Sequence, residues 1–159
     1  MNFELICVGK LKDRFFEDAA AEYVKRLGAF GKVKITELPA ASLPDGPNEK
    51  QILAALEKEA AQILARLPKG AAVYPMCIEG KQLSSEEFSA ELTGAANGGA
   101  GTAVFVIGGS YGLHESVKKA GRLRLSMSKM TFPHRLARVM LLEQIYRAMM
   151  IREGRSYHK

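Results

Sequence analysis

Two loops of small residues are the features of this sequence with the clearest chemical use. The apolar segment 104–107 runs directly into the glycine turn 108–112, and the loop 126–134 (SMSKMTFPH) follows after one short helical segment and a basic strand-like segment. In an α/β protein, loops that follow consecutive strands allow backbone amides and carbonyls to approach a nucleotide-like ligand. We therefore expect the chemistry of this chain to lie where the two loops meet.

The glycine turn also has a plainer explanation. The turn, with the sequence GGSYG, does not match G-x-G-x-x-G, occurs late in the chain, and has no acid about 20 residues further on to hold a ribose diol. A dinucleotide-binding fold is therefore disfavoured. Taken alone, such a turn more often reflects tight backbone geometry than a ligand site. The second loop is what favours a site here.

Hydrophobic periodicity predicts strands that alternate with helices, and so an α/β fold. Strands are expected at 3–8, 33–38, 71–78, 102–107 and 123–126, and helices at 13–29, 48–67, 84–94, 114–120 and 133–153. Asn48 with Gln51, and Ser84 with Glu87, have the spacing of N-terminal capping boxes. We expect a single domain, residues 1–159, built on a mostly parallel sheet that helices cover on both faces.

The positive charge is concentrated at the C-terminal end. The whole sequence carries a formal net charge of +6, but residues 117–159 carry +9 and residues 1–116 carry −3. A basic end favours a surface that docks a polyanion, because Lys and Arg hold phosphates. The alternative is that these side chains only decorate solvated helices. Charge alone leaves both interpretations open.

The sequence predicts a reduced, cytoplasmic protein. Cys7 and Cys77 lie in apolar strand-like runs without C-x-x-C spacing, so we expect buried thiols and neither a disulfide nor a metal site. Glu4 stands where a signal peptide would carry positive charge, and no apolar stretch is long enough to span a membrane.

The last predicted helix should face a partner as well as its own sheet. It is apolar around most of its circumference, at Leu136, Val139, Met140, Leu141, Leu142, Ile145, Tyr146, Met149, Met150 and Ile151. One side would pack on the sheet, and the rest would be an exposed apolar patch in a monomer. We therefore expect a homodimer with this helix near the interface, the alternative being a helix buried inside one subunit.

Six segments, taken together, are specific enough to suggest a family. They are 104–114 (VFVIGGSYGLH), 125–134 (LSMSKMTFPH), 142–148 (LEQIYRA), 157–159 (YHK), 8–12 (VGKLK) and 22–28 (EYVKRLG). They resemble the ribosomal RNA large subunit methyltransferase H family of the SPOUT superfamily, and the resemblance covers essentially the whole chain. It implies an α/β sheet with a deep C-terminal trefoil knot, an exception to the usual absence of knots, and a homodimer.

The resemblance implies transfer of a methyl group from S-adenosylmethionine to N3 of a pseudouridine in helix 69 of large-subunit (23S) ribosomal RNA, on the assembled ribosome. It places the cofactor pocket at Met76, Gly108, Met127, Ser128, Lys129, Met130, Thr131 and Phe132. An apolar slot with backbone polar groups at its edge suits adenine, and Gly108 would let the ligand approach the main chain. Met76 replaces the Leu that family members often carry, a change that keeps volume and apolarity. Without the resemblance, the Met and Phe side chains would be interpreted as ordinary core residues.

Methyl transfer to a ring nitrogen needs correct positioning and a group that assists removal of the N3 proton, but no metal. We hypothesise that Tyr157 and His158, in the C-terminal tail, enter the cofactor pocket of their own subunit or of its partner. His158 is the candidate proton acceptor, and Tyr157 would stack on the pseudouridine or form a hydrogen bond with it. A disordered tail is the alternative.

The candidate RNA-binding residues lie on the last helix, where phosphate contacts would suit a basic face. They are His134, Arg135, Arg138 and Arg147. His134 could instead be an ordinary surface residue, and Arg147 could pair with Glu143 one turn earlier.

Two other functions stay open from the sequence. A non-enzymatic ribosome-binding factor would use the same basic surface without a working cofactor pocket, and binding of S-adenosylmethionine distinguishes the two. A methyltransferase of the same superfamily that acts on another nucleotide or on transfer RNA is the closer rival. No separate RNA-binding domain is evident, which favours a substrate whose docking surface the ribosome supplies. Neither a membrane nor DNA is an expected partner.

Overall fold

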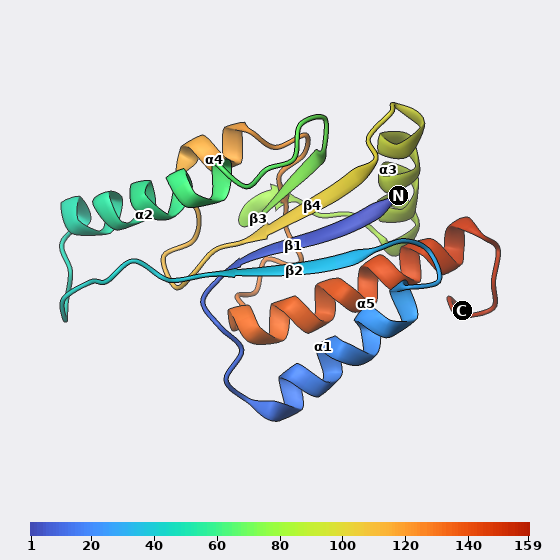
Figure 1. Ribbon diagram of the computed structural model, residues 1–159, viewed down its shortest axis with the longest axis horizontal. Coiled ribbons are helices and arrows are strands. Elements are labelled where there is room, and N and C mark those ends of the chain that lie inside the picture. Colours follow the sequence, from blue (N-terminus) through green and yellow to red (C-terminus); the bar gives the residue numbers. More distant parts are fainter.

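The computed structural model describes residues 1–159, which fold as alternating strands and helices (Figure 1). The strands are β1 (Asn2–Val8), β2 (Val33–Leu38), β3 (Ala72–Lys81) and β4 (Thr102–Ile107). The helices are α1 (Arg14–Leu27), α2 (Glu49–Leu64), α3 (Ser85–Asn97), α4 (Glu115–Lys119) and α5 (His134–Arg152). The expected α/β class is confirmed.

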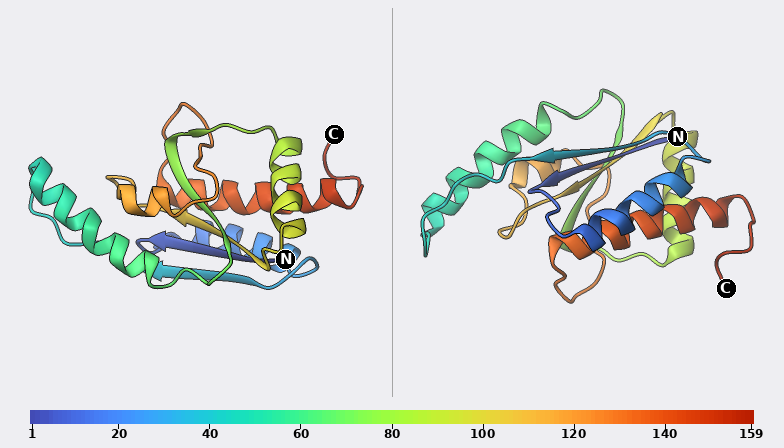
Figure 2. Two further views of the ribbon diagram at one scale, coloured as in Figure 1. Left: turned by 90° about the horizontal axis from the view of Figure 1, so that it is seen from above. Right: turned by 60° about the horizontal axis from the view of Figure 1, so that its bottom comes forward.

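The four strands form one parallel sheet in the order β2-β1-β4-β3. Successive side chains of a strand point to opposite faces. Accordingly, Phe3, Leu5 and Cys7 of β1 belong to one core cluster, whereas Ile6 and Val8 belong to another. The helices α1, α3 and α5 cover the first face, and α2 and α4 cover the second (Figure 2). The predicted sheet with helices on both faces is therefore confirmed.

The helix α5 is the centre of the larger core. It packs against α1 on one side and α3 on the other (Figure 1). Its own Leu142 and Ile145 are completely buried, and in the sheet below the ring of Phe105 stacks on Tyr74 with their centroids 5.1 Å apart. Full burial of a large apolar side chain stabilises the fold by roughly 1.5–3 kcal/mol. This packing fixes α5 against the sheet.

Both predicted capping boxes are present. The Asn48 side chain accepts a hydrogen bond from the Gln51 N–H at 2.9 Å, and the Gln51 side chain accepts one from the Asn48 N–H at 3.0 Å. Ser84 and Glu87 exchange the same two bonds at 3.1 and 2.7 Å. Each pair satisfies two backbone donors that a helix start otherwise leaves free, which explains where α2 and α3 begin.

The strand expected at 123–126 does not form, and this prediction is wrong. Instead, the segment crosses β3, which continues to Lys81, and pairs with it only through isolated bridges of Leu125. The crossing is very close, since a Cβ on Gly80 would lie 2.5 Å from the Leu125 carbonyl carbon and one on Gly121 would lie 2.4 Å from Pro75. Gly80 thus permits a close approach to the Leu125 backbone, and Gly121 a close approach to the Pro75 ring, where a regular ladder was expected.

The two cysteines are free, but they differ in burial. Cys7 is buried, and this burial raises the pKa of its thiol to about 11, so the thiol stays protonated near neutral pH. Cys77 is only half-buried, which corrects the expectation that both thiols are fully enclosed. Among the helices, none combines the length and the apolar character needed to cross a membrane.

Candidate active site

A cavity of about 750 Å³ lies at the carboxyl edge of the sheet, where the ends of β3 and β4 meet the two loops identified in the sequence. Seven of the eight predicted cofactor-binding residues line it: Met76, Gly108, Met127, Ser128, Met130, Thr131 and Phe132. The eighth, Lys129, is exposed and does not line the cavity. The fold therefore brings together segments that are far apart in the chain, although their contact with a cofactor stays a prediction.

The glycine turn is closed by its own backbone. Gly112 adopts a φ of 79°, a left-handed conformation, and its N–H donates to the Gly109 carbonyl at 3.1 Å. A Cβ on Gly108 would lie 2.3 Å from the Gly112 oxygen. The turn folds back against Gly108, which is one reason for a glycine there, and the expected approach of a ligand to this main chain stays a prediction.

The second loop is organised by the hydroxyl groups of two serines. The Ser126 hydroxyl donates to the Ser128 carbonyl at 3.0 Å, and the Ser128 hydroxyl accepts from the Met130 N–H at the same distance. The N–H groups of Thr131 and Phe132 donate to no acceptor within the chain. The loop therefore has a fixed shape and still offers backbone donors to a ligand.

His134 lies at the wall of this cavity, at the start of α5. Burial lowers the pKa of its imidazole, and the nearby positive charges of Arg135 and Arg138 lower it further. The imidazole is therefore neutral at neutral pH. Because His134 lies in the cavity wall, RNA can contact it only by reaching into the cavity.

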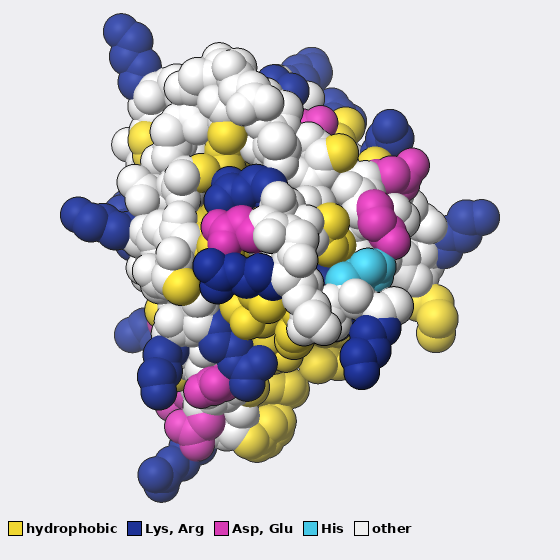
Figure 3. Space-filling view, turned by 90° about the vertical axis from the view of Figure 1, so that its right-hand side faces the viewer, with side chains coloured by type: hydrophobic (Ala, Val, Ile, Leu, Met, Phe, Trp, Pro, Cys, Tyr) yellow, Lys and Arg dark blue, Asp and Glu magenta, His cyan; other side chains and the backbone are white.

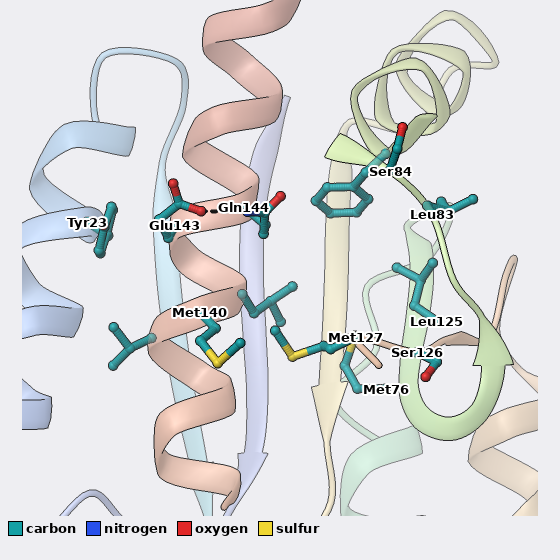
Figure 4. A pocket seen from close by; sticks show the side chains of 13 residues that line it. Tyr23, Met76, Leu83, Ser84, Leu125, Ser126, Met127, Met140, Glu143 and Gln144 are labelled. Carbon is teal, nitrogen blue, oxygen red and sulfur yellow. Dashed lines mark hydrogen bonds between the residues drawn. The ribbon is translucent and has the colours of Figure 1, made fainter. Parts of the chain in front are cut away.

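A second and more apolar cavity of about 410 Å³ lies beside the first, between α1, α5 and α3 (Figure 4). Met76 and Met127 line both cavities and so form the wall between them. Met140 of α5 points into the same space (Figure 4). At the polar rim, the Gln144 amide donates to the Glu143 carboxylate at 2.7 Å.

The C-terminal tail folds back on α5 and does not reach the larger cavity of its own subunit. The Tyr157 hydroxyl donates to Glu143 at 3.2 Å, and the Arg147 guanidinium lies 4.7 Å from the centre of the Tyr157 ring. A ring nitrogen of His158 lies 2.7 Å from the Glu86 carboxylate. Neither tail residue lines the cavity, so the option that the tail serves its own subunit has no support in this arrangement.

The basic C-terminal end is largely neutralised by ion pairs. Of its eleven Lys and Arg side chains, eight are paired with carboxylates: Lys118, Arg122, Arg124, Arg135, Arg138, Arg147, Arg152 and Arg155. The face that carries the tail accordingly shows basic side chains interspersed with acidic ones (Figure 3). The concentration of charge in the sequence therefore does not become a uniformly basic surface.

The three arginines expected to bind RNA are all in such pairs. Arg138 is only 1% exposed and lies 2.5 Å from the Glu37 carboxylate, so we assign it a structural role in place of the expected phosphate contact. Arg135 lies 2.5 Å from Asp13. Arg147 lies 2.5 Å from Glu143, which confirms the pairing considered as its alternative.

The cavity also contains residues that the sequence did not reveal. Ile78, Glu79, Tyr111 and Lys118 all line it, and Glu79 is bonded to Lys118, which lowers the pKa of the Glu79 carboxyl. Tyr111 belongs to the glycine turn, so the turn itself was a usable signal. Nothing in the sequence marks Glu79, because its place depends on the unexpected extension of β3.

Comparison with protein families decides the classification. A family model described as "Predicted SPOUT methyltransferase" matches residues 1–158. The chain belongs to the SPOUT methyltransferase family. The parallel sheet with helices on both faces is the SPOUT-type fold expected from the sequence.

Relatives of similar length carry one description. Proteins from Listeria monocytogenes (45% identical), Bacillus thuringiensis (46%) and Bacillus anthracis (46%) align over 159 residues, 100% of both chains, and are described as "Ribosomal RNA large subunit methyltransferase H". A solved structure from Haemophilus influenzae, a "probable methylase family protein", matches with a TM-score of 0.51 at 11% identity, over 99% of this chain and 70% of that chain. The structural likeness supports the SPOUT fold alone.

Proposed function

We propose that this protein methylates N3 of a pseudouridine in helix 69 of large-subunit ribosomal RNA, using S-adenosylmethionine and acting on assembled ribosomes. The observation that carries the proposal is the cavity that Met76, the glycine turn and the loop 126–132 line together. The description of the relatives, at 45–46% identity over whole chains, supports ribosomal RNA as the substrate. The position of the methyl group follows from the family resemblance noted in the sequence.

The cavity suits S-adenosylmethionine in size and lining. Its volume of about 750 Å³ falls within the usual range of small-molecule sites. Met76, Phe132 and Leu113 provide apolar surface for adenine, and the free N–H groups of Thr131 and Phe132 provide donors for its polar edge. When bound, S-adenosylmethionine supplies an electrophilic methyl group on a sulfonium. The chain's own contribution is to hold this group and exclude water from it.

We assign the removal of the N3 proton to the tail of the partner subunit. The tail of one subunit lies against its own α5 and does not line its own cavity, which favours a second copy as the source of Tyr157 and His158. His158 would accept the proton, and Tyr157 would position the pseudouridine. The rival base is His134, which already lines the cavity as a neutral imidazole.

A tail supplied by the partner subunit requires a homodimer, and the chain has an apolar surface on which a second copy could pack. Leu136, Val139, Met140 and Tyr146 of α5 are only half-buried in one subunit, and the smaller apolar cavity lies between α1, α5 and α3. A second copy seated on this face would cover both. The close crossing of 121–126 over β3, through Gly80 and Gly121, is in keeping with the trefoil knot of the family.

Two measurements test the proposal against its rivals. Isothermal calorimetry with S-adenosylmethionine separates an enzyme from a non-enzymatic ribosome-binding factor, because only the enzyme binds the methyl donor. Transfer of labelled methyl to ribosomes and to transfer RNA, both from cells lacking this protein, separates the ribosomal substrate from a different RNA. Label on transfer RNA alone would overturn the proposed substrate.

A further inference from the structure

Three cations of the basic C-terminal end that lie near the cavity are already paired with carboxylates. Arg135, Arg138 and Lys118 each hold a carboxylate, and a phosphate could bind them only by displacing it. An RNA that enters the cavity must nevertheless be held by its backbone, since phosphates are the main contacts of RNA-binding surfaces. The docking cations must therefore be others.

Two free lysines lie in the loop 9–13 between β1 and α1. Lys10 and Lys12 are both exposed, and neither forms an ion pair, whereas Leu11 between them packs against the larger core cluster. Leu11 thus anchors the loop to the core, and the ammonium groups of Lys10 and Lys12 on either side of it face solvent.

The paired arginines of α5 hold this loop in place. Arg138 donates to the Gly9 carbonyl at 3.1 Å, and its partner Glu37 accepts from the Leu11 N–H at 3.0 Å. Arg135 holds Asp13 at the other end of the loop. The two arginines thus act as clamps, while the lysines of the loop stay free.

The loop stands beside the mouth of the cavity. A Cβ on Gly9 would lie 3.8 Å from the imidazole of His134, which lines the cavity, and the preceding residue Val8 lies 3.5 Å from a Cβ built on Gly109. On the second loop, Lys129 is exposed and unpaired between Ser128 and Met130, both of which line the cavity. Free cations therefore stand on two loops that border one opening.

We propose that Lys10 and Lys12, together with Lys129, form a phosphate-binding rim that docks the RNA backbone at the mouth of the cavity. Lysine suits this role because its ammonium is a flexible point charge that neutralises a phosphodiester without reading the base. The proposal rests on the proposed function, since it names the surface that delivers the RNA to the same cavity.

The test is a double variant, Lys10→Gln with Lys12→Gln, compared with Lys50→Gln with Lys58→Gln. The control lysines are exposed, unpaired and on α2, which covers the opposite face of the sheet, so both variants lose the same charge. Binding to intact ribosomes from a strain lacking this protein is measured over a range of KCl concentrations. We expect the slope of log K, the association constant, against log[KCl] to become less negative by about 2 in the loop variant, about 1 for each lost phosphate contact, and to stay unchanged in the control.

Two further readouts separate the possible failures. The loop variant should bind S-adenosylmethionine as the wild type does, and its KM for ribosomes should rise while kcat is retained. If its salt slope and KM match those of the α2 control, the rim does not exist, even though the wild type transfers methyl groups. If the wild type binds ribosomes but transfers no methyl group, the proposed function fails, whereas the salt slopes still decide whether the rim binds RNA.

Discussion

The guanidinium of Arg138, in the first half of α5, lies 2.5 Å from the carboxylate of Glu37 near the end of β2. The Arg138 side chain is completely enclosed, and its Nε has no hydrogen-bond partner. Through Gly9 and Leu11, the same pair holds the loop after β1 against the start of α5. The pair therefore supports one side of the candidate site.

Replacement of Arg138 by Met should destabilise the protein by about 2–3 kcal/mol, because it leaves the Glu37 carboxylate and the Gly9 carbonyl without their partner. Urea unfolding followed by circular dichroism measures the change. Arg14→Met is the control, because Arg14 is exposed and its distance of 3.9 Å from Asp18 makes a weak ion pair. Its free energy of unfolding should stay within about 0.5 kcal/mol of the wild type. Equal stabilities of the two variants would contradict the supporting role of Arg138.

The same pair predicts a pH dependence of stability. Burial alone would raise the pKa of Glu37, but the bonds from Arg138 and Leu11 outweigh it and hold the pKa below its ordinary 4.5. Since the folded pKa is the lower one, the stabilisation is present above pH 4.5 and is lost as the pH falls through the folded value. Glu37→Gln should therefore be less stable than the wild type at neutral pH, and the difference should shrink in acid. A constant difference in urea unfolding across this range would exclude the linkage.

Gly108→Ala should destabilise the protein by about 1–3 kcal/mol and weaken cofactor binding, because a Cβ there would lie 2.3 Å from the Gly112 oxygen. Gly94→Ala is the matched control. It lies within α3 with no atom near the added methyl group, so it should stabilise the protein by up to about 1 kcal/mol. Thermal unfolding and calorimetry with S-adenosylmethionine measure both effects, and two variants of equal stability would refute the packing argument.

Phe132→Ala should lower the affinity for S-adenosylmethionine about tenfold, since it removes apolar surface worth at least about 1.4 kcal/mol from the cavity. Phe15→Ala serves as its control, because Phe15 is 66% exposed on α1 and does not line the cavity. Calorimetry gives both dissociation constants. An unchanged affinity of the Phe132 variant would mean that adenine does not use this wall.

Deletion of residues 155–159 should abolish methyl transfer and leave the affinity for S-adenosylmethionine within about threefold, because β3 and the two loops, and no residue of the tail, form the walls of the cavity. Mixed dimers test which subunit the tail serves. At a concentration of S-adenosylmethionine at which the Gly108→Ala homodimer is inactive, a deleted subunit paired with a Gly108→Ala subunit should be active, since the intact tail of the second can complete the intact cavity of the first. If the full-length homodimer is active and the mixed dimer is inactive, the tail serves the cavity of its own subunit.

The sequence predicted the regular elements well because their signals are local. The strands Val33–Leu38 and Thr102–Ile107 have the expected bounds, and both capping boxes are built from residues three positions apart. The crossing of 121–126 over β3 was missed because it depends on the close approach of Gly80 to the Leu125 backbone and of Gly121 to the Pro75 ring, which no periodicity records. Sequence charge was a poor guide to the RNA surface for a similar reason, since Asp13 and Glu37 reach Arg135 and Arg138 only in the folded chain.

The most direct test of the proposed activity is transfer of a labelled methyl group from S-adenosylmethionine to RNA from cells lacking this protein, offered as intact ribosomes, free large subunits and naked ribosomal RNA. Mass spectrometry of the digested RNA then locates the label. We predict label on N3 of a pseudouridine in helix 69, in intact ribosomes and not in naked RNA. Ribosomes that bind the protein but remain unlabelled, or label on any other nucleotide, would contradict the proposed function.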